Sequence, residues 1–335
     1  MKLSVVDQSP ISSGSNAAEA FANTIELAQL ADRLGYERYW IAEHHATHSL
    51  ASPAPEIMIT RVAAETKRIR VGSGAVLLPY YAPMKVAETF MVLHTLYPDR
   101  IDLGLGRAPG SGGLEAYALR RDRSERQLGD DVGEQLAELL AFLDHGQGFP
   151  EDHPFSRIHL SPDMPGGPDV WMLGSSLWSA HAASQLGLPY AFAHFINPEP
   201  TRNALATYRE LYARNDWPDP PRTILALGVL CAETEEEAEY QSAPMRLRRR
   251  LRGTGISGPI PSPEEALAQL ATLPDIPMHD ASEWPRYIMG SQEQVHRQLS
   301  DIAAAVQTDE LMVVTITHSH AARLRSYELL AEAFG

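Results

Sequence analysis

Residues 3–42 read LSVVDQSPISSGSNAAEAFANTIELAQLADRLGYERYWIA and contain one strand–helix–strand repeat. The apolar run Leu3–Val6 is followed by a helical pattern over Asn16–Leu34, whose apolar residues gather on one broad face. Gly35 comes next, a residue that often ends helices, and Tyr39–Ala42 is a second apolar run. Nearly continuous apolar runs are typical of parallel strands that are buried on both faces. This stretch therefore predicts a β–α–β unit.

The same alternation continues along the chain. We expect strands at Leu3–Val6, Tyr39–Ala42, Ile69–Leu77, Arg100–Leu105, Asp169–Leu173, Tyr190–Phe195, Ile224–Cys231 and Glu310–Ile316. We expect helices at Asn16–Leu34, Pro55–Thr66, Pro83–Tyr97, Ser124–Leu143, Ser176–Leu186, Thr201–Tyr212, Ser291–Val306 and Ala321–Phe334. Eight such repeats predict an α/β fold, a (β/α)8 TIM barrel. The alternative is an open doubly wound sheet, which needs a glycine-rich loop where this chain has Asp7-Gln8-Ser9-Pro10.

The seventh and eighth predicted strands lie farther apart than a barrel crossover requires. The intervening chain holds an arginine cluster at 246–252, a short helical pattern, and Gly- and Pro-rich stretches on both sides of it. We expect residues 233–290 to form an insertion over the barrel mouth, within a single domain that spans residues 1–335. A smaller Pro- and Gly-rich insertion is expected at 146–167.

Composition narrows the classes of function. Hydrophobic residues make up 44% of the chain and charged residues 21%, which is ordinary for a globular protein. The net charge of −15 argues against nucleic acids and anionic membranes as partners. Cys231 is the only cysteine, so no disulfide can form within the chain. With no signal-peptide pattern and no apolar stretch near the ~18 residues of a membrane span, we expect a cytoplasmic protein.

Polar residues follow nearly every predicted strand. In TIM barrels the chemistry sits at the carboxyl ends of the strands, so these residues are candidates for a site. A polar residue at one loop start is ordinary, but the whole set indicates a functional rim. Its members are Asp7, Gln8, Glu43, His44, His45, Gly74, Arg107, Ser175, Ser176, His194, Asn197, Glu233, His318 and His320.

An anion site is predicted after the fourth and fifth strands. The turn at 104–110, GLGRAPG, does not match the dinucleotide fingerprint, because its third glycine comes one position late. Its Arg107 instead offers a fork of donors for an anion. Ser175, Ser176 and Ser179 begin the helix after the fifth strand, where backbone N–H groups and hydroxyls suit a phosphate. Serine at a helix start is more often only a cap, but the neighbouring Arg107 favours the phosphate.

Metal chemistry has weak support in the histidine pattern. The adjacent His44 and His45 would point to opposite sides of an extended segment, so we predict no metal ligands there. One of these imidazoles can act as acid, base or hydrogen-bond donor. His318 and His320 could face one side, but no matching His-x-His follows the first strand.

Two features of the basic residues bear on function. Lysine occurs only at Lys2, Lys67 and Lys85, none of them at a strand end, which argues against Schiff-base chemistry. The arginine cluster at 246–252 is either a solvated helix face or a group that steers an anionic ligand toward the mouth.

Four segments together resemble a known family. They are GYERYWIAEHH at 35–45, VGSGAVLLP at 71–79, RIDLGLGR at 100–107 and GLP at 187–189. In this order and spacing they resemble the bacterial-luciferase-like flavin-dependent monooxygenases, in the luciferase-family oxidoreductase subgroup. The resemblance extends over nearly the whole chain, from Leu3 to Phe334.

The resemblance implies a barrel that binds reduced FMN, supplied by a separate flavin reductase, and uses O2 to oxidise a small organic substrate. It implies that His44 is catalytic, with Glu43 beside the flavin ring, and that the Gly74–Ala75 bond is a cis peptide behind that ring. The flavin phosphate would be held by Arg107, Ser175, Ser176 and Ser179. The other cofactor-binding positions that it implies are Val6, Ser73, Gly106 and His194.

The resemblance also implies a homodimer through the helices Pro55–Thr66 and Pro83–Tyr97. Gln8, Tyr80, Tyr81 and His194 are expected to line the substrate pocket, together with the insertions. The alternatives are a hydride-transfer enzyme that uses the deazaflavin F420, a non-catalytic flavin-binding protein, and a sugar-phosphate isomerase. The isomerase would place its phosphate after strands seven and eight, whereas the predicted anion site follows strand five.

Overall fold

The computed structural model describes residues 1–107, 113–120, 131–144, 148–251, 254, 258–274 and 282–335. The predicted TIM barrel is confirmed, because eight parallel strands close into a ring. From β10 the order is β1, β2, β3, β5, β6, β7 and β8, and β8 pairs with β10 again. The strands are β1 (Lys2–Asp7), β2 (Arg38–Ile41), β3 (Arg70–Ser73), β5 (Ile101–Gly106), β6 (Asp169–Gly174), β7 (Tyr190–Ala193), β8 (Thr223–Ala232) and β10 (Glu310–Val314).

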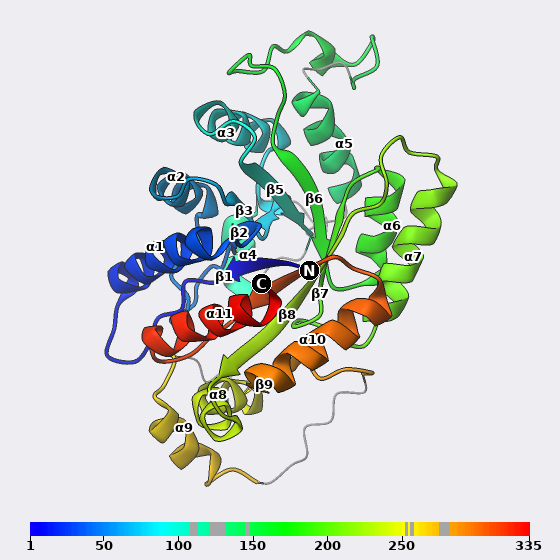
Figure 1. The fold of residues 1–335 in the computed structure, drawn as a ribbon. Coiled ribbons are helices and arrows are strands. Elements are labelled where there is room, and N and C mark those ends of the chain that lie inside the picture. The colour runs from blue at the N-terminus through cyan, green and yellow to red at the C-terminus, as the bar shows by residue number, and fades with distance from the viewer. Residues whose placement is uncertain (108–112, 121–130, 145–147, 252–253, 255–257, 275–281) are drawn as a thin grey trace.

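Helices surround this ring (Figure 1). They are α1 (Ala17–Leu34), α2 (Pro55–Glu65), α3 (Pro83–Leu96), α5 (Val132–Leu143), α6 (Leu177–Gln185), α7 (Thr201–Arg214), α10 (Gln292–Val306) and α11 (His320–Phe334). Local signals explain their ends: Asn16 accepts the N–H groups of Ala18 and Glu19 at the start of α1, and Gly35 ends that helix with φ 82°. Among the described helices, none is both long and apolar enough to cross a bilayer.

The third predicted strand, Ile69–Leu77, is divided in the structure. β3 ends at Ser73, and the chain resumes as the short strand β4 (Val76–Leu77). The peptide bond between Gly74 and Ala75, which lies between the two strands, is cis, as expected. Both parts of the predicted strand still pair with β5: β3 pairs with its beginning and β4 with its end.

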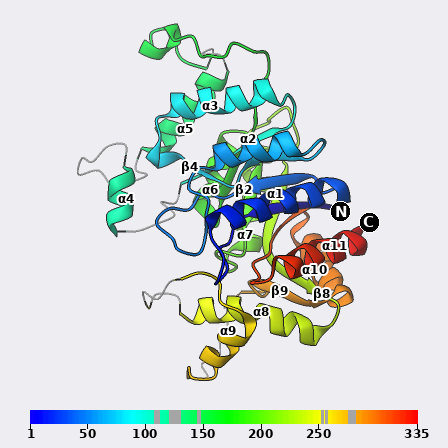
Figure 2. The ribbon, with the colours of Figure 1, turned by 90° about the vertical axis from the view of Figure 1, so that its left-hand side faces the viewer.

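The long insertion contains more regular structure than the sequence predicts. It holds α8 (Glu235–Arg250), α9 (Pro263–Leu270) and β9 (Tyr287–Ser291). The short helix expected in the insertion corresponds to α9, and the end of α8 carries arginines of the cluster that was expected either on a helix face or as a steering group. Pro244 inside α8 and Gly290 in β9 weaken the local pattern of both elements. β9 pairs with β8 outside the closed ring. Figure 2 shows α8 and α9 together, well away from α3 and α5.

Two further segments differ from expectation. The predicted helix Ser124–Leu143 begins at Val132 in the described part, and residues 124–130 lie outside it. The short helix α4 (Gly113–Leu119) was not predicted. Figure 2 shows α4 on the side of the molecule opposite the two chain termini.

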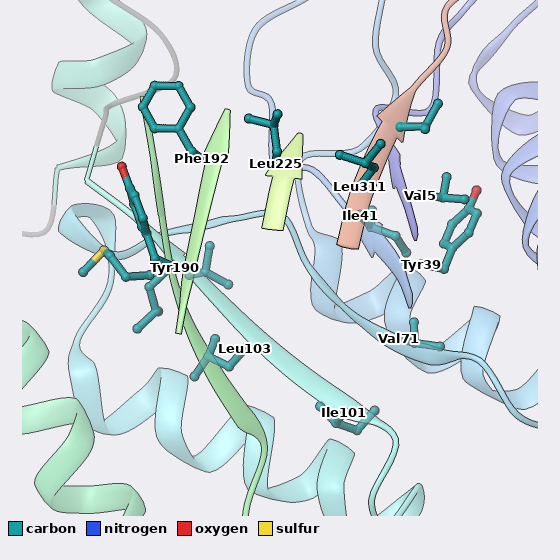
Figure 3. Close-up of a cluster of buried hydrophobic side chains, with 14 of the residues drawn as sticks. Val5, Tyr39, Ile41, Val71, Ile101, Leu103, Tyr190, Phe192, Leu225 and Leu311 are labelled. Atoms are coloured by element: carbon teal, nitrogen blue, oxygen red, sulfur yellow. The ribbon is translucent and has the colours of Figure 1, made fainter. Parts of the chain in front are cut away.

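Alternate residues of the strands fill two separate apolar clusters. Val5, Tyr39 and Ile41 belong to the large cluster between the strands and the helices (Figure 3). Val6 and Trp40, their direct neighbours in sequence, belong to a second cluster with Trp171 and residues of β7, β8 and β10. Successive side chains on a strand point to opposite faces, so the second cluster fills the barrel interior.

Buried ion pairs join the beginnings of several barrel strands. Arg38 of β2 donates to Glu310 of β10 at 3.0 Å and to Asp102 of β5 at 2.9 Å. Asp102 also accepts from Arg70 of β3 and from the indole N–H of Trp40, both at 2.8 Å. Burial opposes the charge on Arg38, but Asp102 and Glu310 outweigh it and raise the pKa of Arg38. We call these five residues the barrel floor.

Replacing Asp102 with alanine should destabilise the whole fold. Arg38 would lose one of its two hydrogen-bonded carboxylates in a buried position, which costs about 3–5 kcal/mol of unfolding free energy. Urea denaturation of wild type and Asp102→Ala measures the loss. Glu210→Ala, which removes an exposed ion pair with Arg214, is the control and should cost below about 0.5 kcal/mol. Equal stability of the two variants would contradict this role of the floor.

Candidate functional site

Glu43 is held rigidly just after β2. Its Oε2 accepts the backbone N–H of Leu77 at 2.9 Å, and its Oε1 accepts the hydroxyl of Tyr81 at 2.8 Å. The Nε2 atom of His45 lies 2.7 Å from Oε1. Burial raises the pKa of Glu43, and the bonds from His45, Leu77 and Tyr81 offset part of that rise. The result is a fixed carboxyl group that takes up a proton more readily than an exposed glutamate.

His44 points elsewhere, as expected for neighbouring residues on an extended segment. Its backbone N–H donates to the carbonyl of Ser52 at 2.9 Å. Its Nδ1 atom is buried and has no hydrogen-bond partner among the residues that the structure describes. Burial, with the neighbouring His45 and Arg248, lowers the pKa of His44 to about 4. The imidazole is therefore neutral at physiological pH, with one ring nitrogen available to a bound molecule.

Four of the predicted cofactor residues meet around the cis peptide. A Cβ atom on Gly74 would lie 3.2 Å from Val6 Cγ2 and 3.0 Å from the Cβ of Trp40. A Cβ atom on Gly106 would lie 3.2 Å from the Cβ of Ala75. Gly74 and Ala75 are half-buried, although the strand residues on both sides of them are buried. Gly74 and Ala75 therefore remain partly accessible beside Val6 and Gly106.

Arg107 and Ser176 lie at the same end of the barrel. Their strands, β5 and β6, are neighbours, with Leu105 opposite Met172. The guanidinium of Arg107 stacks over the ring of Trp178 with its Cζ 4.3 Å from the ring centroid. Trp178 lies in the first turn of α6, and Ser176 is the N-cap of that helix, with a side chain that makes no cap bond. Arg107 therefore lies beside the first turn of the helix that Ser176 caps, and such a combination of groups could bind an anion.

The other two serines of the predicted phosphate site are engaged differently. The hydroxyl of Ser179 donates to the carbonyl of Ser176 at 2.7 Å and lies 3.0 Å from the hydroxyl of Tyr190. Ser175 accepts a hydrogen bond from Asn197 through its carbonyl at 3.2 Å. The Ser179 hydroxyl therefore stabilises the first turn of α6, whereas the hydroxyls of Ser175 and Ser176 bond to no described residue and remain available to a ligand.

The side chains of Ser73 and His194 also form hydrogen bonds within the protein. The Ser73 hydroxyl donates to the carbonyl of Gly104 at 2.9 Å and accepts its N–H at 3.0 Å, which links β3 to β5. His194, directly after β7, is buried with Nδ1 2.8 Å from the Thr201 hydroxyl and Nε2 3.0 Å from the carbonyl of Pro285. His194 thus connects the barrel to the insertion, and both of its ring nitrogens are engaged.

Other rim residues form ion pairs or loop contacts. Asp7 is buried, and although burial opposes its charge, Arg323 at 2.6 Å and Tyr39 lower its pKa. Glu233 pairs with Arg325 on the surface. Within the described ranges, no group of three His, Cys, Asp or Glu side chains is arranged to hold a metal ion. The rim that is left for chemistry lies mainly after β2, β3, β5 and β6.

The structure adds Trp178 to the site and gives His45 and Tyr81 roles that the sequence analysis did not assign. Trp178 positions Arg107, and His45 and Tyr81 position Glu43. Tyr80 packs edge-on against His45 with ring centroids 6.0 Å apart. The tyrosines were expected only in the substrate pocket, and no spacing rule pairs them with a carboxylate on another loop. The position of Trp178 could have been predicted from the sequence, because it follows the expected helix cap Ser176 by two residues and so lies in the first helical turn.

The lowered pKa of His44 predicts an unusual titration. Exposed histidines in proteins take up a proton at about pH 6.5, but His44 should remain neutral until the pH approaches 4. Nitrogen-15 NMR of histidine-labelled protein from pH 7.5 to 5 should show one unchanging neutral ring that is absent from His44→Asn. As the unfolded chain protonates this residue at higher pH, His44 reduces stability as the pH falls from 6.5 to 4. A His44 signal that titrates near pH 6.5 would contradict its burial.

Comparison with known proteins places this architecture in a family. A family model described as luciferase-like monooxygenase matches residues 1–327. The uncharacterized protein YwcH of Bacillus subtilis (strain 168) is 44% identical over 336 residues, covering 100% of this chain and 99% of YwcH. N-acetyl-S-alkylcysteine monooxygenase of the same strain is 33% identical and covers 99% and 98%. The crystal structure of apo-MsnO8 is similar with a TM-score of 0.92 and 49% identity, covering 99% and 98%.

More distant structures share the fold alone. The oxygenating constituent of 3,6-diketocamphane monooxygenase from Pseudomonas putida, solved with FMN, has a TM-score of 0.74 at 20% identity, covering 99% and 97%. An F420-dependent secondary alcohol dehydrogenase has a TM-score of 0.71 at 13% identity, covering 100% and 99%. The enzyme class expected from the sequence, a flavin-dependent monooxygenase, agrees with the family and with its named monooxygenases. The chain belongs to the luciferase-like monooxygenase family.

Proposed function

We propose that this chain is the oxygenase component of a two-component system. It would bind reduced FMN from a separate flavin reductase and use O2 to oxidise a small organic substrate. The observation that carries this proposal is the meeting of Arg107 with the start of α6, on the same rim as the half-buried Gly74–Ala75 peptide. When bound, reduced flavin supplies the electrons with which O2 is activated.

Arg107, Ser176 and the backbone of α6 would hold the phosphate of FMN. The positive end of the helix dipole and the free N–H groups of the first turn favour an anion. The indole of Trp178 holds the guanidinium beside that turn, which limits the rotamer entropy lost on binding. Ser176 supplies a hydroxyl that is not used as a cap.

Gly74, Ala75, Val6 and Gly106 would form the surface against the flavin ring. The two glycines let the backbone pack closely at this point, because a Cβ atom at either would lie within 3.2 Å of a neighbouring side chain. Glu43 is fixed nearby on the loop after β2 by three hydrogen bonds, and it would position the ring and exclude water. His44 is neutral, and its unpartnered Nδ1 would hold or donate a proton during the oxidation.

The double variant Arg107→Ala/Ser176→Ala should bind FMN about 10–100-fold more weakly, because one or more charge-assisted hydrogen bonds of about 1.5–3 kcal/mol are removed. Fluorescence titration of FMN measures the dissociation constant. Ser156→Ala/Arg214→Ala, which removes an exposed arginine and a surface serine, is the matched control and should leave it unchanged. Equal FMN affinity of the double variant and the wild type would remove the phosphate assignment.

F420 is the second candidate cofactor, because the same fold serves F420-dependent enzymes. Oxygen electrode measurements with reduced FMN separate the two. Substrate-dependent O2 uptake favours the monooxygenase, and N-acetyl-S-alkylcysteines are suitable first compounds because a relative is named for them. Tight F420 binding without O2 uptake would favour hydride transfer.

We further propose a homodimer through α2 and α3, which lie side by side (Figure 1). A groove between them is lined by Ile57, Val92 and Leu96, which are 66%, 45% and 57% exposed. Its rim carries both signs of charge, with Glu56, Arg61, Lys85 and Glu88. A two-fold axis would bring acidic groups of one copy opposite basic groups of the other, which makes a second copy the best-suited occupant.

Ile57→Asp/Leu96→Asp should convert the dimer to a monomer, because each copy would bury two carboxylates without partners in the shared interface. Sedimentation velocity at micromolar concentration measures the mass. Leu267→Asp, at another partly exposed leucine, is the control and should remain dimeric. Monomeric wild type, or a double variant that is still dimeric, would refute this interface.

A further inference from the structure

We propose that Arg248 of α8 binds a carboxylate group of the organic substrate, on the side of the barrel mouth where the His44 loop lies. This inference rests on the proposed function, because it assigns the class of molecule that the oxygenase would take. It selects one residue from the arginine cluster at 246–252, which the sequence left either as a solvated face or as a steering group.

The insertion that carries Arg248 is anchored at the mouth beside the His44 loop. The N–H of Ile260 donates to the carbonyl of Ile11, and the N–H of Ser13 donates to the carbonyl of Ile260, both at 2.7 Å. The same loop after β1 pairs with the loop after β2, where the N–H of Ile11 donates to Ser49 at 2.8 Å. Backbone hydrogen bonds therefore hold three segments together: the insertion, the β1 loop and the His44 loop.

Arg248 lies on a different face of α8 from its neighbour Arg246. Two positions along a helix differ by about 200°, so these side chains leave on opposite faces. Arg246 pairs with Glu239 at 2.5 Å. Arg248 is half-buried and makes no hydrogen bond or ion pair with any described residue. Burial lowers the pKa of Arg248, which Tyr287 of β9 opposes, and Arg248 itself acts on the pKa of His44.

An unpaired guanidinium in such a place indicates an anionic ligand. Arginine keeps its charge at any physiological pH, and a partly buried charge without a counter-ion is unfavourable. The planar fork of donors matches a carboxylate through two parallel hydrogen bonds. His44 Nδ1, on the loop after β2, is a second polar atom with no hydrogen-bond partner among the described residues. The phosphate site proposed for FMN is at Arg107, which follows β5 on the other side of the ring from α8 (Figure 1).

Calorimetric titration tests this assignment without requiring turnover. The probes are benzoate, hexanoate and N-acetylmethionine, each with its uncharged amide. Wild type should bind at least one carboxylate, and the matching amide at least tenfold more weakly. Arg248→Gln should reduce the carboxylate affinity at least tenfold, to the level of the amide. Arg248→Lys, which keeps the charge without the fork, should be intermediate, and the control Arg246→Gln should behave as wild type.

Two results would overturn the proposal. One is that wild type binds none of the three carboxylates at 10 mM, and the other is that Arg248→Gln binds them as wild type does. FMN titration of the same variants separates this inference from the proposed function. Arg248→Gln should retain its FMN affinity, and a loss there would assign Arg248 to the cofactor instead. Failure of FMN to bind wild type at all would count against the proposed function, while the carboxylate comparison would still decide the role of Arg248.

Discussion

The ion pair between Arg38 and Asp102 is the constraint on which the site depends. Arg38 begins β2, and Glu43 follows the end of that short strand. Asp102 lies near the start of β5, and Arg107 follows its end. The floor thus fixes the two strands that carry Glu43 and Arg107 at the mouth. Because a barrel strand is nearly inextensible, an anchor at one end sets the height of the side chains at the other.

The mouth above this floor divides into regions of different chemistry. A small uncharged surface around the cis peptide lies between a cationic corner at Arg107 and the buried carboxyl of Glu43. The interior below it is closed by Val6, Trp40 and Trp171, so water has little access from beneath. Arg248 adds a second cationic group from the insertion, separate from the first. This division suits two ligands at once: an anionic cofactor with a planar ring, and a smaller acid beside it.

The sequence was sufficient for the barrel, the order of its strands and the ring of polar residues at their ends. Strand and helix periods decide those features, and they are local. The sequence also predicted that the side chains of His44 and His45 point to opposite sides. In the structure the His45 ring contacts the carboxyl group of Glu43, whereas the Nδ1 atom of His44 has no partner among the described residues. The sequence could not show which polar side chains are already hydrogen-bonded within the protein. The hydroxyls of Ser73 and Ser179 bond to backbone groups of the protein, and only the folded chain reveals that the N-cap residue Ser176 makes no cap bond with its side chain.

The insertion illustrates the same limit. The sequence pattern does not distinguish the five arginines between 246 and 252 from one another. The helix face on which each arginine of α8 lies depends on where the helix begins and on where the insertion docks. The docking of the insertion on the barrel depends on backbone pairing between Ile260 and the loop after β1, and no local sequence pattern predicts that pairing. Pro244 further obscured the helix.

A crystal structure of the protein soaked with FMN tests the central claim most directly. The account predicts phosphate density between Arg107 and the first turn of α6, with the isoalloxazine ring against Gly74 and Ala75. Density for the phosphate beside Arg248, or for the ring away from the cis peptide, would contradict it.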